Sequence, residues 1–297
     1  MTGDAAWMPR SLGQLLERPR FEVIPLRGVE ERVAVLPPGT TLTVTCSPRK
    51  GVDATLDVAE RLAAGGFRVI PHVSARLVRS GEHLAEIMER LQEAGIRDVF
   101  VVGGDGAAPS GPFRSAFELL TAMARSGRPM PTVGVGAYPE RHPFLDYQVL
   151  FEALRAKQDF ASFMVTQICF DAATIVGWLA AIRRRGIHLP VHIGVPGAVK
   201  RRNLLEISLR VGVGDSVRYL TKHGSIVTRL MRRGGYRPDA LVAGVAPFVG
   251  DPSLRIAGFH VNTFNQLEGT ERWRRQVLTV YGRNRAAEPP VAGGRAG

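Results

Sequence analysis

The sequence predicts a single-domain (β/α)8 TIM barrel, an α/β fold, and three observations support this prediction. Short apolar runs rich in β-branched residues recur eight times along the 297 residues. Most of these runs are almost continuously apolar, as expected for parallel strands that are buried on both faces. Amphipathic helical patterns lie between them. Strands and helices that alternate in this way indicate a closed parallel barrel, and the chain is long enough for one.

The predicted strands cover residues 21–26, 41–46, 68–73, 98–104, 132–138, 163–169, 191–197 and 258–264. Helices are predicted at 81–94, 113–125, 172–185 and 215–233; the last two begin near Asp or Ser and end before glycine. The stretch 219–250 is longer than a standard unit and is expected to carry two helices. An open doubly wound sheet is the alternative, but no Gly-x-Gly-x-x-Gly motif follows the first strand.

The chain divides into three predicted parts. Residues 1–18 form a peripheral N-terminal segment, 19–285 form the catalytic barrel, and the Pro/Gly/Ala-rich residues 286–297 form a flexible tail. No apolar stretch is long enough to span a bilayer, and the N-terminus lacks a signal-peptide core, so we expect a cytoplasmic protein with no membrane partner. Cys46 and Cys169 lie in apolar runs and are expected to be buried thiols in a reducing compartment.

The net charge is +12, and the basic residues are mostly arginine. They are spread along the chain, with short clusters at 183–185, 200–202 and 232–233. No nucleic-acid-binding motif accompanies them, so we expect solvated helix faces and binding of small anionic ligands, not a nucleic-acid partner. The sequence does not indicate an oligomeric state.

Polar residues interrupt or follow the predicted strands at the end where barrel enzymes place their active sites. They are Glu22, Thr45, Ser47, His72, Ser74, Asp105, Tyr138, Glu140, His142, Thr166, Gln167, Asp171, Asn262, Thr263 and Asn265.

Glu22 is the leading catalytic candidate because it lies in the apolar stretch Phe-Glu-Val-Ile-Pro. The alternative is an outward-facing Glu at the start of a strand. If the side chain points inward, we expect desolvation to raise its pKa, which would suit it to donate a proton near neutral pH.

Two loops are further candidates. Gly103-Gly104-Asp105-Gly106 would let a ligand approach the backbone, although it also suits a plain tight turn. The stretch 137–143 presents Tyr138 and His142 between two prolines, or is only a rigid loop. His72 by itself is more typical of a core histidine. No metal-ligand spacing and no Gly-x-Ser-x-Gly motif are present, so we expect neither a metal nor a serine nucleophile.

Together these motifs resemble the methylenetetrahydrofolate reductase family. The resemblance rests on Phe-Glu-x-x-Pro at 21–25, Val-Thr at 44–45, Pro-His at 71–72, Gly-Asp at 104–105, Ala-Tyr-Pro-Glu-x-His-Pro at 137–143, Thr-Gln-x-x-Phe-Asp at 166–171 and Gly-Phe-His-Val-Asn-Thr-Phe-Asn at 258–265. The motifs span nearly the whole barrel, in the family's order and at the strand ends.

The resemblance implies reduction of 5,10-methylenetetrahydrofolate to 5-methyltetrahydrofolate. By their positions in the motifs, Glu22 would be the general acid, with Asp105 as a second catalytic residue. Asp105, Gln167 and Tyr138 would bind the folate substrate. The positions that surround the flavin in typical members correspond to Thr45, His72, Gly104, Tyr138, His142 and Lys157.

Departures from the family's pattern argue against FAD. Gly103 stands where typical members have arginine, and Ala156 precedes Lys157 where they have a second basic residue. Loss of such charge-assisted contacts costs about 1.5–3 kcal/mol each. The resemblance is therefore to the divergent flavin-independent branch, in which NADH passes hydride directly to the folate; NADPH is left open as donor. Residues 200–202 are expected to bind an anionic tail of one of these molecules.

Three alternatives follow from the same residues. They are an FAD-dependent reductase, an enzyme that works in the oxidative direction, and a non-catalytic folate-binding barrel.

Overall fold

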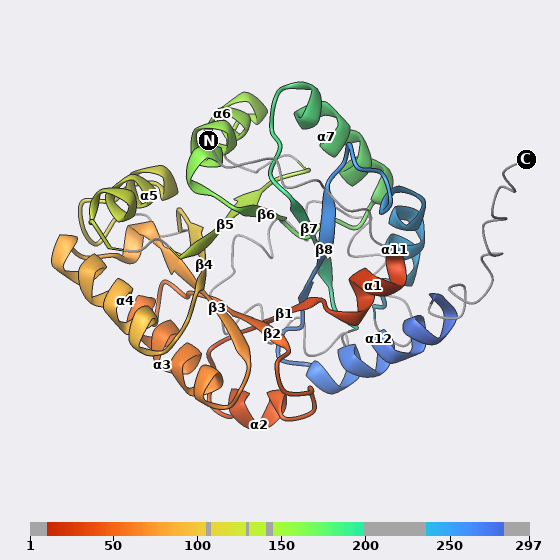
Figure 1. Cartoon of the computed structure of the whole chain (residues 1–297), viewed down its shortest axis with the longest axis horizontal. Coiled ribbons are helices and arrows are strands. Elements are labelled where there is room, and N and C mark those ends of the chain that lie inside the picture. Colours follow the sequence, from red (N-terminus) through yellow and green to blue (C-terminus); the bar gives the residue numbers. More distant parts are fainter. Residues whose placement is uncertain (1–10, 105–107, 129–130, 141–144, 199–235, 282–297) are drawn as a thin grey trace, which may run out of the picture.

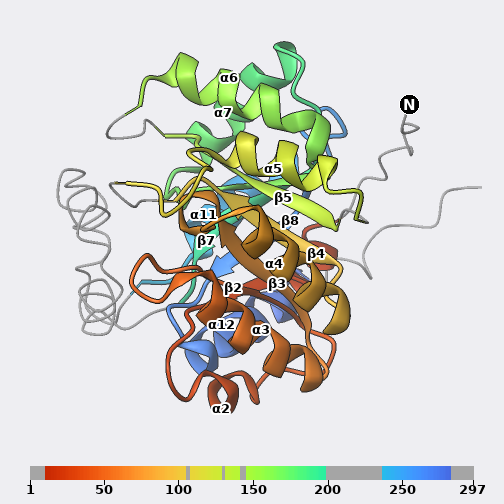
Figure 2. The ribbon, with the colours of Figure 1, turned by 90° about the vertical axis from the view of Figure 1, so that its left-hand side faces the viewer.

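A computed structural model describes residues 11–104, 108–128, 131–140, 145–198 and 236–281. Its strands close into a parallel barrel in the order β1–β8, with helices around the outside (Figure 1). Figure 2 shows the arrangement from the side, with α3, α4 and α5 in front of the strands. The predicted fold class is confirmed.

The strands are β1 Arg20–Val23, β2 Thr41–Val44, β3 Arg68–Ser74, β4 Asp98–Val102, β5 Thr132–Ala137, β6 Phe163–Thr166, β7 Val191–Pro196 and β8 Ile256–Asn262. The helices are α1 Leu12–Glu17, α2 Val29–Val33, α3 Gly51–Ala64, α4 Gly81–Glu93, α5 Ala116–Arg125, α6 Tyr147–Lys157, α7 Ala172–Arg184, α11 Asp239–Val245 and α12 Leu267–Tyr281.

Every predicted strand overlaps an observed one, and the three predicted helices that fall within the described residues are confirmed. The helix predicted at 215–233 lies outside the described residues. β1 ends three residues before its predicted boundary because the backbone turns there, and Leu26 N donates to the carbonyl of Ile24. Pro25 has no amide hydrogen for the sheet at this point.

Alternation along each strand separates two cores. One face of each strand packs against the surrounding helices, for example through Val99 and Val101 of β4. The other face fills the barrel interior, where Phe100 joins Ile70 and Phe163 in a separate apolar cluster. This separation explains the continuous apolar runs, since both faces of each strand are buried.

α1 lies in the segment expected to be peripheral, yet it belongs to the hydrophobic core. Its side chains Leu12, Leu15 and Leu16 are buried, and the helix contacts α12 and β8. Ser11 caps it through a reciprocal pair of hydrogen bonds with Gln14. The tail 286–297 lies outside the described residues. Within the described ranges, no helix combines the length and apolarity needed to cross a bilayer.

Gly194 marks a close approach between β6 and β7 that only glycine allows. A Cβ atom there would lie 2.1 Å from the carbonyl oxygen of Thr166. Because that oxygen belongs to the sheet backbone, it cannot easily move. We therefore expect Gly194→Ala to lower the free energy of unfolding by about 1–3 kcal/mol, as overpacking does.

Urea unfolding of both proteins measures this effect, and Gly177→Ala is the matched control. Gly177 is exposed in the middle of α7, and an added Cβ meets no atom within 4 Å. There the same substitution should stabilise the protein by about 0.5–1 kcal/mol. Equal effects at both positions would contradict the steric argument.

Candidate active site

Glu22 points into the barrel. In the β1–β8 pairing it lies opposite Asn262, and on β8 His260 is two residues earlier on the same face. The side chain retains 18% exposure, so it borders the opening while most of it is covered. The predicted inward orientation is thus confirmed, and the alternative of an outward Glu is excluded.

Hydrogen bonds hold both carboxylate oxygens of Glu22. Asn262 Nδ2 donates to Oε1 at 2.6 Å. His260 Nε2 lies 3.0 Å from Oε2, and His72 Nε2 lies 3.9 Å from the same oxygen. Asn262 and both histidines thereby fix the orientation of the carboxylate.

The expected rise in the pKa of Glu22 is wrong. Burial does push the pKa of this carboxyl upward, and it is the largest single influence. The hydrogen bond from His260, the electrostatic influence of the His260 and His72 imidazoles, and the hydrogen bond from Asn262 together outweigh it and lower the pKa below its ordinary value. These contacts therefore favour the carboxylate at neutral pH.

His72 is a buried neutral base next to this carboxylate. Burial lowers its pKa to about 4, although the negative charge of Glu22 opposes the shift. Its ring lies 4.7 Å from that of Phe100, centroid to centroid. His72 Nε2 has no hydrogen-bond partner among the described residues. The ring is thus packed like a core histidine, yet its Nε2 faces the Glu22 carboxylate.

The loop after β8 locks the end of β1 in place. Thr263 Oγ1 donates to the carbonyl of Glu22 at 2.6 Å. Asn265 bonds the backbone of Ile24 twice: its Oδ1 accepts from the amide and its Nδ2 donates to the carbonyl. Asn265 has a φ of 58°, a left-handed conformation that asparagine tolerates better than most residues. These polar residues therefore position Glu22 through its backbone.

Other predicted residues gather at the same end of the barrel. Thr45 follows β2, Gly104 follows β4, Tyr138 follows β5, and Gln167 follows β6 with an exposed side chain. Gly104 has a φ of +97°, and a Cβ there would lie 2.0 Å from Ser74 Oγ, so this position requires glycine. The strand ends thus surround the opening beside Glu22.

One predicted residue, Lys157, is not at this end of the barrel, and others lie outside the described residues. Lys157 ends α6, shortly before β6 begins, so its backbone lies at the opposite end of the barrel. Burial lowers its pKa to about 8. Asp105, His142 and the basic run 200–202 lie outside the described residues. In the 183–185 cluster, Arg183 donates to the carbonyls of Ile187 and Leu254 and is structural.

Cys169 connects two of the loops. Its thiol donates to Glu140 Oε1 at 3.2 Å, which joins the loop after β5 to the loop after β6. Burial raises the pKa of this thiol to about 12, so it is not a nucleophile at neutral pH. Asp171 accepts from Thr174 N and caps α7. Both cysteines are free thiols; Cys169 is buried as expected, whereas Cys46 is only partly buried.

Comparison with known families now adds to this geometry. Residues 28–207 match the model of the methylenetetrahydrofolate reductase family. The chain belongs to this family. The match covers more than half of the chain and runs from α2 to beyond β7.

Curated reductases from two yeasts are similar over a shorter segment. Methylenetetrahydrofolate reductase 1 of Schizosaccharomyces pombe is 27% identical over 124 residues, which is 39% of this chain and 21% of the relative. Methylenetetrahydrofolate reductase 2 of Saccharomyces cerevisiae is 25% identical over 121 residues, which is 37% of this chain and 20% of the relative. The matched segment thus spans about a fifth of either yeast protein.

One solved structure, a lyase/mutase candidate from Burkholderia cenocepacia J2315, aligns with 94% of this chain and 91% of its own, at 17% identity and a TM-score of 0.46. A likeness this distant carries no functional argument.

His260 is a site residue of this reductase-family chain that the sequence did not single out. It stands within the Gly-Phe-His-Val-Asn motif, two residues before Asn262. Because alternate residues of a strand share a face, the pair points the same way. Knowing that β8 closes the barrel against β1 would have placed His260 beside Glu22.

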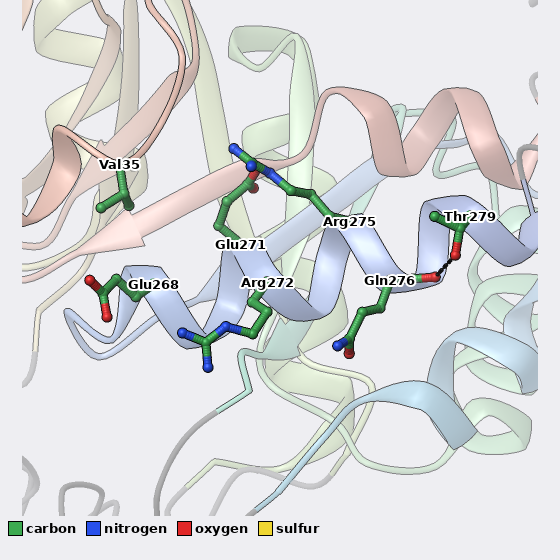
Figure 3. A pocket seen from close by; sticks show the side chains of 7 residues that line it. All are labelled: Val35, Glu268, Glu271, Arg272, Arg275, Gln276 and Thr279. Carbon is green, nitrogen blue, oxygen red and sulfur yellow. Dashed lines mark hydrogen bonds and ion pairs between the residues drawn. The ribbon is translucent and has the colours of Figure 1, made fainter.

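A surface cavity of about 470 Å³ lies along α12, away from this site. Figure 3 shows its lining side chains along α12, with Val35 from the segment after α2. Glu271, which borders it, is paired with Arg274 and Arg275. None of the predicted site residues lines this cavity.

Proposed function

We propose that the protein reduces 5,10-methylenetetrahydrofolate to 5-methyltetrahydrofolate, with hydride passing directly from NADH to the folate. The inward-facing Glu22, held between His260 and Asn262 at the carboxyl end of β1, is the observation that carries this proposal. Membership of the reductase family supports it. Barrel enzymes build their active sites at this end.

Glu22 acts as the general acid in this proposal. A proton delivered to N10 opens the five-membered ring and leaves an iminium at N5, which then accepts the hydride. Bound folate would cover the exposed part of the Glu22 side chain and increase its desolvation, which raises the pKa and favours uptake of the proton. After transfer, the carboxylate stabilises the neighbouring cation.

The residues around the opening would bind the folate. Gln167 is exposed at the end of β6, and its amide offers both donors and an acceptor to a pterin ring. We assign Tyr138 and Asp105 to the same task, and Asp105 also to catalysis. Thr45, His72, Gly104, Tyr138 and His142 then border the nicotinamide.

The described residues fit a flavin dinucleotide poorly, which supports direct transfer. Gly103 offers no positive charge for a phosphate, and the backbone of Lys157 lies at the far end of β6. A nicotinamide dinucleotide arrives as a substrate and needs no such permanent site.

The purified full-length protein tests this proposal. We expect a colourless preparation that oxidises NADH when methylenetetrahydrofolate is present, without added FAD. Parallel assays with NADPH identify the preferred donor. Yellow protein, or turnover that begins only after FAD is added, would contradict direct transfer and favour a flavin-dependent reductase.

Gly103→Arg should restore part of a flavin site. A Cβ at this position meets no atom within 4 Å, so a side chain can leave the backbone here without a clash at its first carbon. A guanidinium contact to a phosphate contributes about 1.5–3 kcal/mol, so FAD affinity should rise at least about tenfold. Titration of FAD by fluorescence quenching measures this change. Gly103→Gln is the uncharged control, and an equal gain with Gln would rule out the charge as its cause.

A further inference from the structure

We propose that Glu22, His72 and His260 form a binding site for a divalent transition-metal ion, and that the ion and the folate substrate exclude each other. Glu22 Oε2 and one ring nitrogen of each histidine all lie within 4.8 Å of one another. Their local sequence spacing gave no indication of this site, because the three ligands come from β1, β3 and β8 and meet only through the barrel.

The distances suit one ion. Zinc binds imidazole nitrogen and carboxylate oxygen at about 2.0–2.2 Å, which places two ligand atoms of a tetrahedral site about 3.4 Å apart. The separations from Glu22 Oε2 are 3.0 Å to His260 Nε2 and 3.9 Å to His72 Nε2, on either side of that value. The ring nitrogens of His72 and His260 lie within 4.8 Å of each other, so side-chain shifts would also have to bring the two imidazoles to the ligand separation.

The chemistry of the three groups suits a metal as well. Both histidines are at least nine-tenths buried, and His72 Nε2 has no hydrogen-bond partner among the described residues although it faces the carboxylate. Two imidazoles and one carboxylate are a ligand set that both zinc and iron(II) use in catalytic sites. To bind, His260 would move its ring hydrogen from Nε2 to Nδ1.

Asn262 supports the site from outside. Its amide holds Glu22 Oε1 at 2.6 Å and leaves Oε2 directed toward the two histidines. Such outer contacts orient a ligand and typically affect metal affinity about 10–100-fold. The proposed metal site is argued from this geometry alone, whereas its competition with folate rests on the proposed function.

Cobalt(II) is the probe. Full-length protein is freed of metal with a chelator and titrated with Co²⁺ without folate or nucleotide, while its visible absorption is recorded. We expect saturation at one equivalent per chain and displacement of Co²⁺ by Zn²⁺. His72→Ala and Glu22→Gln should each weaken binding at least about 100-fold, since even outer residues cost about 10–100-fold.

His188→Ala is the matched control, because that side chain is exposed and far from the cluster in the chain, and it should bind as the wild type does. Thermal unfolding of each variant shows that it is folded. Absence of saturable binding, or unchanged binding in folded His72→Ala, would overturn the site. Loss of binding in His188→Ala would assign the signal to a surface histidine and overturn it too.

Competition is measured separately. Zn²⁺ should raise the KM for methylenetetrahydrofolate without changing kcat, and a chelator should reverse this. Inhibition that leaves KM unchanged would overturn mutual exclusion. If metal-free protein binds Co²⁺ as described but shows no reductase turnover, the proposed function fails and the metal site stands. If it shows turnover but does not bind Co²⁺, the metal site fails and the proposed function stands.

Discussion

Glu22→Gln is expected to lower kcat by about 10²–10⁴-fold, the usual contribution of a general acid. Glutamine keeps the shape of the side chain, and its carbonyl can still accept the hydrogen bond from Asn262 Nδ2. It has no acidic proton for N10 and no negative charge for the iminium. Folate should therefore bind with an affinity within a few-fold of the wild type. Single-turnover NADH oxidation and folate titration measure these two quantities.

The control for this variant is Glu30→Gln. Glu30 lies on α2 and forms a half-exposed ion pair with Arg61 at 2.7 Å, so the substitution removes an equal charge away from the barrel mouth. Its kcat should match that of the wild type. Full activity in Glu22→Gln would exclude Glu22 as the acid. Loss of folate binding along with activity would indicate a binding role instead.

The fold was predictable because its signal is local. Each strand fills two apolar environments, so runs such as 98–102 contain few polar residues wherever they stand in the chain. Capping residues mark the ends of helices in the sequence; for example, the Ser80 side chain caps α4 by accepting a hydrogen bond from His83 N. Neither signal depends on knowing which strands are neighbours.

The site was only partly predictable because its energetics are not local. Glu22 is conspicuous as a charge among apolar residues, but the direction of its pKa shift depends on His260 and Asn262, which are far away in the sequence. Desolvation alone predicts a raised pKa, and the hydrogen bonds reverse it. Lys157 shows the converse: its motif position suggested a ligand contact, and the end of α6 places its backbone at the other side of the barrel.

The burial of His72 should make the protein sensitive to acid between pH 6.5 and about 4. Burial lowers the pKa of this imidazole from 6.5 to about 4. In that interval the unfolded chain binds a proton at His72 and the folded protein does not. The free energy of unfolding is therefore highest above pH 6.5 and falls as the pH drops toward 4.

This dependence amounts to about 3 kcal/mol, since each unit of difference in pKa is worth about 1.4 kcal/mol. Urea unfolding at several pH values measures it. His72→Gln removes the titrating group. The free energy of unfolding of this variant should therefore depend much less on pH between 4 and 6.5, whatever the variant's stability at neutral pH.

Two comparisons separate His72 from the other ionisable groups. His188→Gln changes an exposed histidine and should keep the wild-type slope. The lowered pKa of Glu22 also makes stability fall with acid, but below the ordinary carboxyl value of 4.5, so its effect lies at the lower edge of the interval. If His72→Gln kept the full slope above pH 4.5, the pKa of His72 would not be lowered by burial. His72 would then not be the neutral base that the proposals for Glu22 and for a metal ion require.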